Sequence, residues 1–194
     1  MRKCAILSMD SLADFEAYDD LIDQPMLALG WQTEVVSWRN SSVNWSDYEV
    51  VVIRSPWDYQ DDMESFVKVL TNIEQSSARL ENSLNVVQWN INKIYLTHLE
   101  ADDVTIVPTL WPDAFNADNL AAYFTHFSTA QIVLKPRVSA NADNTFWLTQ
   151  DNYRSKTAEL IAAFASRELM VQPFMADICQ EGEFSLFYFN GEFS

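Results

Sequence analysis

The chain has 194 residues, of which 48% are hydrophobic and 13% aromatic, so it can bury a substantial core without disulfides or a structural metal. Acidic residues outnumber basic ones by 28 to 12, and the resulting net charge of −16 argues against nucleic-acid binding, because it repels phosphate backbones. The sequence has no basic cluster for a membrane surface and no apolar run of about 20 residues. Two cysteines make no disulfide framework, and with no recognisable signal peptide they favour the cytoplasm as the compartment.

Glycine and histidine are both scarce, and this excludes several kinds of site. The three glycines, Gly30, Gly182 and Gly191, are too scattered for a dinucleotide fingerprint or a P-loop, which need glycines clustered in a tight turn. The two histidines, His98 and His126, fall in helix-like segments with no Ser or Cys constellation nearby. A His-based catalytic triad is therefore a poor interpretation of this sequence.

The first part of the chain alternates short apolar runs with helix-like spacing. The predicted strands are 4–8, 34–38 and 48–53, and the predicted helices are 15–29 and a segment from 61 or 62 to about 75. The third strand is apolar on both faces, as in a central parallel strand. Gly30 is expected to end the first helix, and Asp61 or Asp62 to cap the second. This order predicts an α/β layer with a parallel sheet.

The second part begins near Val86 and mixes strands and helices. The predicted helices are 93–100, 116–127 and 152–166, and the predicted strands are 106–107, 131–135, 145–149, 169–172 and 183–189. The first of these helices can be capped by Asn90 or Asn92. Asn190-Gly191 is a strong hairpin signal, but only three residues follow it. We therefore expect this sequence to be a fragment, cut within a sheet.

Two lysines occupy positions that suit phosphate. Lys135 follows three apolar residues and precedes Pro136, which places an ammonium group at a sheet edge where ligands bind. The alternative is a solvent-exposed lysine at a strand end. Lys93 lies near the start of a predicted helix, where a cation is unfavourable unless an anion such as phosphate binds there. The alternative is an exposed helix lysine.

Arg54 directly follows the third strand, within the sequence RSPWDY. It can bind a carboxylate or a phosphate through two parallel hydrogen bonds, with Trp57 and Tyr59 as pocket walls. The alternative is a loop whose aromatic residues close the end of the sheet and whose Arg54 pairs with Asp58. The Glu181-Gly182-Glu183 segment can bind a ribose or orient a lysine, or it can be an ordinary acidic turn.

Five segments occur in the order and spacing of an ATP-grasp enzyme. They are WNINK at 89–93, PTLW at 108–111, VLKP at 133–136, MVQPFM at 170–175 and EGEFSLFYFNGE at 181–192. The chain resembles the glutathione-synthetase-like branch of that superfamily, particularly its ligases of D-cycloserine-biosynthesis type. The resemblance implies a Rossmann-like preATP-grasp domain at 1–88 and an α+β ATP-grasp lid subdomain at 89–175. It implies the first strands of an incomplete C-terminal ATP-grasp subdomain at 176–194.

The resemblance also implies roles for individual residues. The lysines that hold ATP phosphates are matched by Lys93 and Lys135, and an acidic position near the nucleotide is matched by Glu183. The hinge whose backbone faces adenine is matched by Gln172, Pro173, Phe174 and Met175. A loop that helps to bind the acceptor substrate is matched by Arg54, Ser55 and Asp58. Residues 139–145 match a flexible loop over the phosphates, although this loop lacks glycine. We expect residues 136–147 to be mobile without nucleotide.

The implied activity is that of a carboxylate–amine ligase that uses ATP and Mg²⁺ and forms an acyl-phosphate. Its partners would be ATP, a small carboxylate and an amine, with no nucleic acid or membrane. The family's metal ligands would lie beyond the hairpin, so we assign no metal ligand and no catalytic residue here, and we expect this chain alone not to catalyse ligation. The alternatives are a non-catalytic nucleotide-binding or regulatory module with the same fold and an α/β protein with surface lysines. An exposed sheet edge favours pairing with a second copy, as in a homodimer, or aggregation.

Overall fold

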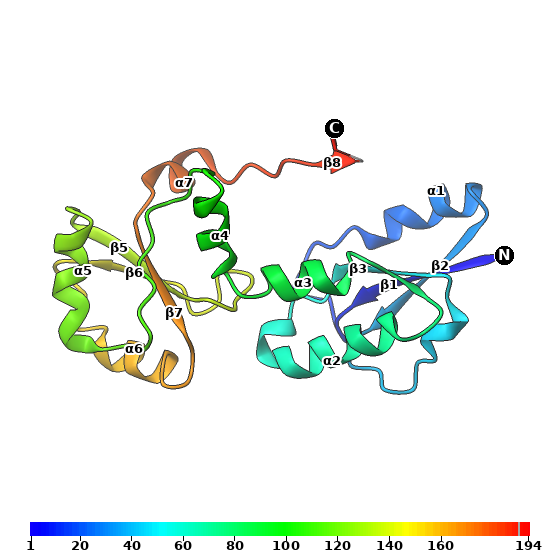
Figure 1. Cartoon of the computed structure of the whole chain (residues 1–194), viewed down its shortest axis with the longest axis horizontal. Coiled ribbons are helices and arrows are strands. Elements are labelled where there is room, and N and C mark those ends of the chain that lie inside the picture. Colours follow the sequence, from blue (N-terminus) through cyan, green and yellow to red (C-terminus); the bar gives the residue numbers. More distant parts are fainter. Residues whose placement is uncertain (190) are drawn as a thin grey trace. The chain divides into compact units, whose positions relative to one another are not determined.

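The computed structural model describes residues 1–189 and 191–194, so Asn190 of the predicted hairpin lies outside the described residues. The chain forms two compact units (Figure 1). The first unit contains Met1–Val104 and Arg137–Asp143, and the second contains Thr105–Pro136 and Asn144–Ser194. The chain therefore passes from one unit to the other three times, and segment 137–143 belongs to the first unit although both of its neighbouring strands belong to the second.

The first unit is built on a parallel sheet. Its strands are β1 (Arg2–Ser8), β2 (Trp31–Ser37), β3 (Val50–Ser55) and β4 (Arg79–Glu81). They are ordered β2-β1-β3-β4, and every neighbouring pair is parallel. β1 and β3 each have a neighbour on both sides, so their apolar residues are buried, as at Leu7 and Val51. The predicted parallel α/β sheet is confirmed.

Helices and turns connect these strands. They are η1 (Asp19–Ile22), α1 (Asp23–Ala28), η2 (Trp45–Asp47), η3 (Tyr59–Asp61), α2 (Met63–Glu74), α3 (Leu84–Asn90) and α4 (Tyr95–Ala101). α2 begins as predicted, because the Asp62 carboxylate accepts a hydrogen bond from the Ser65 amide at 3.1 Å. Hydrogen bonds from Ser65 lower the pKa of Asp62. Phe66, Leu70 and Ile73 line the buried face of α2 and belong to one hydrophobic core with Leu7 and Val51 of the sheet.

The second unit contains an antiparallel sheet ordered β6-β5-β7. Its elements are η4 (Ala117–Asn119), α5 (Leu120–His126), β5 (Gln131–Pro136), β6 (Phe146–Thr149), α6 (Thr157–Ala163), β7 (Leu169–Pro173), α7 (Ala176–Glu181), β8 (Tyr188–Phe189) and β9 (Glu192–Phe193). One face of the sheet packs with α5 and α6 around Ile132, Leu134, Leu148 and Leu160. The strands predicted at 131–135 and 145–149 are present and pair with each other.

Several predicted boundaries are wrong. Only 19–28 of the expected helix 15–29 is helical, and its apolar residues Leu21 and Leu27 are exposed, so no buried face extends the helix. Residues 106–107 form no strand; the bridge to β7 forms instead at Leu110, beyond the proline at 108 that cannot donate to a ladder. The helices expected to begin at 93, 116 and 152 begin at 95, 120 and 157, after turns or a short 3₁₀ segment.

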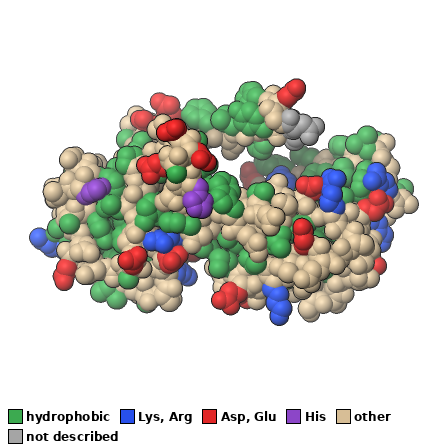
Figure 2. Space-filling model, in the orientation of Figure 1, with side chains coloured by type: hydrophobic (Ala, Val, Ile, Leu, Met, Phe, Trp, Pro, Cys, Tyr) green, Lys and Arg blue, Asp and Glu red, His purple; other side chains and the backbone are tan. Residues whose placement is uncertain are grey.

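The C-terminal segment departs most from the prediction. Residues 176–181 form α7, so Glu181 ends a helix and does not open a strand, and only Tyr188–Phe189 of the expected strand 183–189 is paired. The alternating side chains of Phe184 and Leu186 are 79% and 66% exposed because no sheet neighbour covers them. Figure 2 shows hydrophobic side chains at the surface along this segment. The short β4 and α3 were not predicted either.

Within the described residues, no helix is both long and apolar enough to cross a membrane.

The core of the first unit makes a simple stability prediction. Leu70→Ala empties a fully buried site under the sheet, so it should lower the free energy of unfolding by about 2–5 kcal/mol. Leu29→Ala is the matched control, because Leu29 is 74% exposed and its loss should change stability by no more than about 0.5 kcal/mol. Urea unfolding measures both variants. Equal destabilisation by the two variants would contradict the packing described for α2.

Candidate functional site

The carboxyl ends of β1 and β3 meet at one edge of the parallel sheet, and polar residues gather there. Ser8 ends β1 and Ser55 ends β3, and their buried hydroxyl oxygens are 2.9 Å apart. Ser55 Oγ also donates a hydrogen bond to a carboxylate oxygen of the buried Asp19. Ligands of open α/β sheets bind outside the carboxyl ends of the strands, so this edge is a candidate binding site.

Arg54 reaches the same buried carboxylate. Its Nε lies 3.1 Å from Asp19 Oδ1, so Arg54 pairs with Asp19 and the alternative pairing of Arg54 with Asp58 is wrong. The Asp19 side chain is 5% exposed, whereas that of Arg54 is 43% exposed. The buried Asp19 carboxylate therefore holds the Nε side of the Arg54 guanidinium, and the side chain of Arg54 remains accessible to solvent or to a ligand. Asp19 was not predicted as a site residue, because it lies inside a segment predicted as an ordinary helix.

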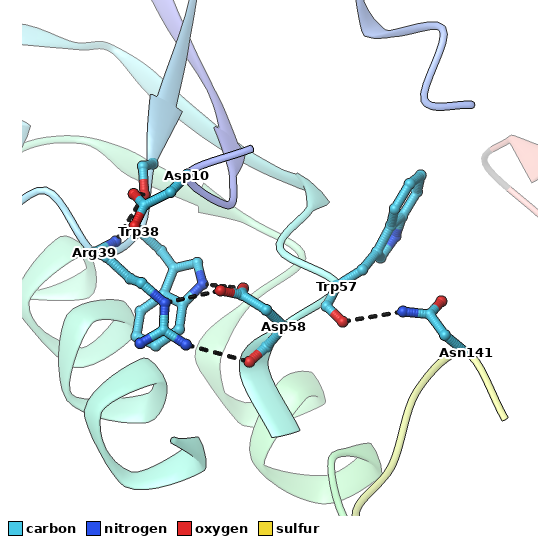
Figure 3. A network of polar contacts seen from close by, with 7 residues as sticks. Asp10, Trp38, Arg39, Trp57, Asp58 and Asn141 are labelled. Atoms are coloured by element: carbon cyan, nitrogen blue, oxygen red, sulfur yellow. Dashed lines mark hydrogen bonds and ion pairs between the residues drawn. The ribbon is translucent and has the colours of Figure 1, made fainter. Parts of the chain in front are cut away.

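Asp58 holds its loop to the end of β2 (Figure 3). Its two carboxylate oxygens accept hydrogen bonds from Trp38 Nε1 at 2.6 Å and Arg39 Nε at 2.8 Å, and Arg39 Nη2 donates to its carbonyl oxygen at 3.4 Å. The Arg39 guanidinium also lies over the Trp38 ring, 4.0 Å from its centroid. These contacts give the Asp58 side chain a positioning role for the loop that carries Trp57 and Tyr59.

Lys93 contacts segment 137–143 within the first unit. Its Nζ donates to the carbonyl oxygen of Ser139 at 2.7 Å and to Ser139 Oγ at 2.9 Å, and its backbone amide donates to Arg137 O at 2.8 Å. Asn141 Nδ2 donates to Trp57 O at 3.1 Å (Figure 3), and Tyr59 Oη donates to Ser139 O at 3.4 Å. The segment thus joins Lys93 to the loop after β3, two parts of the predicted site that are far apart in sequence.

Lys135 lies on the face of the second sheet that is opposite to its core. Side chains alternate along β5, so Ile132 and Leu134 enter the core while Lys135 takes the other face, with Met170 of β7 as its register partner. Gln172 shares this face with Lys135, and its Nε2 donates to Thr109 Oγ1 at 2.9 Å. Burial lowers the pKa of Lys135, and the negative charge of Glu183 opposes that shift.

An aromatic pair lies on this same face of the sheet. The rings of Trp147 and Phe174 stack with centroids 4.6 Å apart and planes 12° apart. Gln131 contacts both residues. Trp147 Nε1 donates a hydrogen bond to Gln131 Oε1 at 2.9 Å, and the Phe174 amide donates one to the Gln131 carbonyl oxygen at 3.1 Å. Trp147 is 54% exposed, so it offers a flat aromatic surface to a ligand. Sequence reasoning missed Trp147, although alternation along β6 places it opposite the core residue Leu148.

The remaining predicted residues lie next to this pair along the chain. Pro173 ends β7 opposite Ile132, Met175 caps α7 and is 38% exposed, and Glu183 is exposed beyond α7. The second unit therefore gathers Lys135, Gln172 and Phe174 from the predicted set on one face of a sheet. Lys93 and the loop that carries Arg54 belong to the first unit.

The described residues form no cluster of three or more side chains that could hold a metal ion. Across 1–189 and 191–194, no three His, Cys, Asp or Glu side chains lie together so as to hold a metal. Glu181 and Glu183, the acids nearest to the predicted nucleotide residues in the sequence, are both exposed. We therefore assign no metal ligand.

A groove of about 610 Å³ in the first unit contains none of the predicted site residues. It lies between the segment 38–46 and α2 and is lined by Trp38, Trp45, Lys68 and Asn72 among others. No cluster of ionisable groups able to hold a metal lies there or elsewhere in the described part of the chain. The groove meets the candidate site only through Trp38 and Arg39 among the described residues, which line it and also hold Asp58.

The sequence matches known proteins along most of its length. Residues 4–82 match the family described as D-cycloserine synthetase DcsG, N-terminal domain. Cycloserine biosynthesis protein DcsG of Streptomyces lavendulae is 28% identical over 172 residues, which cover 86% of this chain and 56% of that protein. The chain thus spans about half the length of this relative.

Solved structures share the fold. The crystal structure of D-cycloserine synthetase DcsG superposes with a TM-score of 0.85 at 22% identity, over 99% of this chain and 66% of that one. D-alanyl-alanine synthetase A from Vibrio cholerae superposes with a TM-score of 0.69 at 12% identity, over 100% of this chain and 64% of that one. Residues 4–82 therefore match the model of the D-cycloserine synthetase N-terminal domain, and the chain as a whole shares the fold of these solved structures.

Proposed function

We propose that this chain is the nucleotide- and acceptor-binding part of an ATP-dependent carboxylate–amine ligase. The observation that carries the proposal is the face of the second sheet where Lys135 and Gln172 lie with the stacked Trp147–Phe174 pair. A nucleotide needs a cation for its phosphates and an apolar, flat surface for its base. This sheet face supplies both.

We assign the binding of ATP phosphates to two lysines, Lys135 of the second unit and Lys93 of the first unit. Lys135 is partly removed from water, and a charge interacts more strongly with phosphate where the surroundings are less polar. Glu183 is close enough to influence Lys135 electrostatically, which supports its proposed place near the nucleotide.

The adenine is assigned to Trp147 and to the segment Gln172–Pro173–Phe174–Met175. The exposed Trp147 ring can stack on the base. Pro173 has no amide hydrogen, and the Phe174 amide already donates to Gln131. The carbonyl oxygens of this segment are therefore the backbone groups that we assign to the adenine amino group.

The acceptor substrate is assigned to the edge of the first sheet. Arg54 would bind the substrate carboxylate with the part of its guanidinium that Asp19 does not occupy. Ser55 is buried against Asp19 and Ser8, and Asp58 is occupied by Trp38 and Arg39. Both therefore support the loop, and Arg54 is the group most open to a ligand.

The proposed reaction has two steps. A carboxylate oxygen attacks the γ-phosphorus of ATP, which forms an acyl-phosphate and releases ADP. The amine then attacks the acyl carbon and displaces inorganic phosphate, which gives an amide and a proton. The lysines neutralise phosphate charge, and Arg54 positions the carboxylate. Magnesium belongs to the proposed reaction through the resemblance, but the described residues contain no cluster of three or more potential metal ligands, so no step here is assigned to it.

A second candidate is a nucleotide-binding or regulatory module without catalysis. The observation that favours it is the lack of a carboxylate cluster for a metal among the described residues. An assay of ATP hydrolysis with magnesium and a panel of carboxylates and amines separates the two functions. Turnover above that of Lys135→Ala supports the ligase. ATP binding without turnover supports the module.

The proposal keeps three further assignments. The domains are 1–88, 89–175 and 176–194, although the compact units divide the chain first after Val104. The compartment is the cytoplasm, in keeping with two free cysteines. The oligomer is a homodimer, which the exposed apolar residues Phe184 and Phe187 favour; sedimentation measures it.

Removal of the Lys135 ammonium should weaken ATP binding. Lys135→Ala deletes a charge-assisted hydrogen bond, so the dissociation constant should rise about 10- to 100-fold in calorimetric titration. Lys156→Ala is the matched control, because Lys156 is exposed and pairs only with Glu159 on α6. The same affinity in both folded variants would contradict the assignment of Lys135.

Removal of the Trp147 ring should weaken binding of the adenine base and leave binding of the phosphate groups unchanged. Trp147→Ala should weaken ATP by about 5- to 100-fold, since base–aromatic stacking contributes roughly 1–3 kcal/mol, and should leave binding of inorganic tripolyphosphate unchanged. Lys135→Ala should weaken both ligands. Equal losses of ATP and tripolyphosphate in Trp147→Ala would show that the ring supports the fold and does not bind adenine.

A further inference from the structure

The ammonium group of Lys93, to which the proposed function assigns an ATP phosphate, is hydrogen-bonded to Ser139. Two oxygen atoms of this one residue, its carbonyl and its hydroxyl, accept from Lys93 Nζ at 2.7 and 2.9 Å. A phosphate that binds Lys93 presents the same kind of group, oxygen acceptors at hydrogen-bond distance. Ser139 and phosphate therefore compete for the same donors.

We propose that Ser139 is an internal competitor for phosphate at Lys93 and that Tyr59 and Asn141 hold it there, so that ATP binding releases segment 137–143. The inference rests on the proposed function, because it takes Lys93 as a phosphate-binding residue. It adds two residues, Tyr59 and Asn141, that set nucleotide affinity without touching the nucleotide.

Both holding contacts come from the loop after β3. Asn141 Nδ2 donates to Trp57 O at 3.1 Å, and Tyr59 Oη donates to Ser139 O at 3.4 Å (Figure 3 shows the first). The Tyr59 ring is itself fixed against Phe66 of α2, with centroids 5.6 Å apart. The Asp58 contacts to Trp38 and Arg39 fix the backbone between these two positions. The segment is thus held by a loop that is itself packed against α2 and bonded to Trp38 and Arg39.

The backbone of the segment favours its release. Asn141 and Ala142 have φ values of 52° and 57°, in the left-handed region that alanine rarely adopts. No glycine relieves this conformation. The contacts with Lys93, Trp57 and Tyr59 must offset the free-energy cost of this backbone conformation. When phosphate replaces the contacts with Lys93, the remaining contacts stabilise the bound position of the segment less.

Competition of this kind lowers the apparent affinity for ATP. A ligand that binds only the released state has its dissociation constant raised by the inverse of that state's population. Loss of one neutral hydrogen bond shifts such an equilibrium by about two- to tenfold. Variants that weaken the hold should therefore bind ATP more tightly, which is the opposite of what loss of a ligand-binding residue does.

The test uses the double variant Tyr59→Phe/Asn141→Ala, which removes both holding donors. Its matched control is Tyr18→Phe/Asn72→Ala, the same chemical changes at two exposed positions outside the segment and its contacts. Calorimetry measures the affinities for ATP and tripolyphosphate, and amide hydrogen exchange measures protection of 137–143 without ligand. A further variant, Ser139→Ala, removes one competing oxygen and leaves the backbone acceptor.

We expect the double variant to bind both ligands about two- to tenfold more tightly than the control and to exchange faster at 137–143. Ser139→Ala should show a smaller gain in affinity. Unchanged exchange in the double variant would overturn the holding contacts. Faster exchange with unchanged or weaker affinity would overturn the competition while the proposed function survives. If no variant binds ATP or tripolyphosphate, the proposed function and this inference both fail.

Discussion

The alternation of side chains along β5 is the constraint on which the candidate site depends. One residue of each pair must enter the core with α5 and α6, and the next must face the other way. Ile132 and Leu134 occupy the buried positions. Lys135 is consequently fixed on the opposite face, beside Met170 and on the same side as Gln172. Because register is set by a buried hydrophobic pattern, the same packing that stabilises the second unit also places its cation and its aromatic pair.

The charge of the chain makes its few placed cations important. A protein with a net charge of −16 repels a nucleotide at long range, so any affinity for phosphate must come from local groups. The cations of the first unit that the candidate site uses have defined partners: Arg54 contacts Asp19, Arg39 contacts Asp58, and Lys93 contacts Ser139. The first two pair with carboxylates, whereas the two contacts of the Lys93 ammonium group to Ser139 are to neutral oxygen atoms. A phosphate that replaces these two contacts displaces no negative charge from Ser139.

The sequence predicted the parallel sheet, the strands of the second sheet and the cap of α2 because these depend on local signals. Continuous apolar runs indicate buried strands, and Asp62 precedes a helix with a regular apolar face. The C-terminal segment shows the limit of such signals. Its alternation from Glu183 to Phe189 is typical of a strand, but only two of those residues find a strand to pair with. Strand formation requires a neighbour, and sequence pattern alone does not supply one.

The candidate site was predicted in part for a similar reason. Lys135 and Lys93 stood out by their position at the ends of elements, and Arg54 by its place after a strand. Asp19 and the contact of Tyr59 with Ser139 were not predicted, because they join residues 36 and 80 positions apart, Asp19 to Ser55 and Tyr59 to Ser139. Such contacts depend on tertiary structure, whereas the face occupied by Trp147 follows from the alternation along β6.

The most direct test of the account is a map of where ATP acts on the folded protein. Backbone and indole NMR signals, titrated with ATP, report every part of the chain separately, including each tryptophan. The account predicts the largest changes at Lys135, Gln172 and the Trp147 indole, with further changes at Ser139. Changes confined to the groove between residues 38–46 and α2, with the Trp147 indole unmoved, would contradict it.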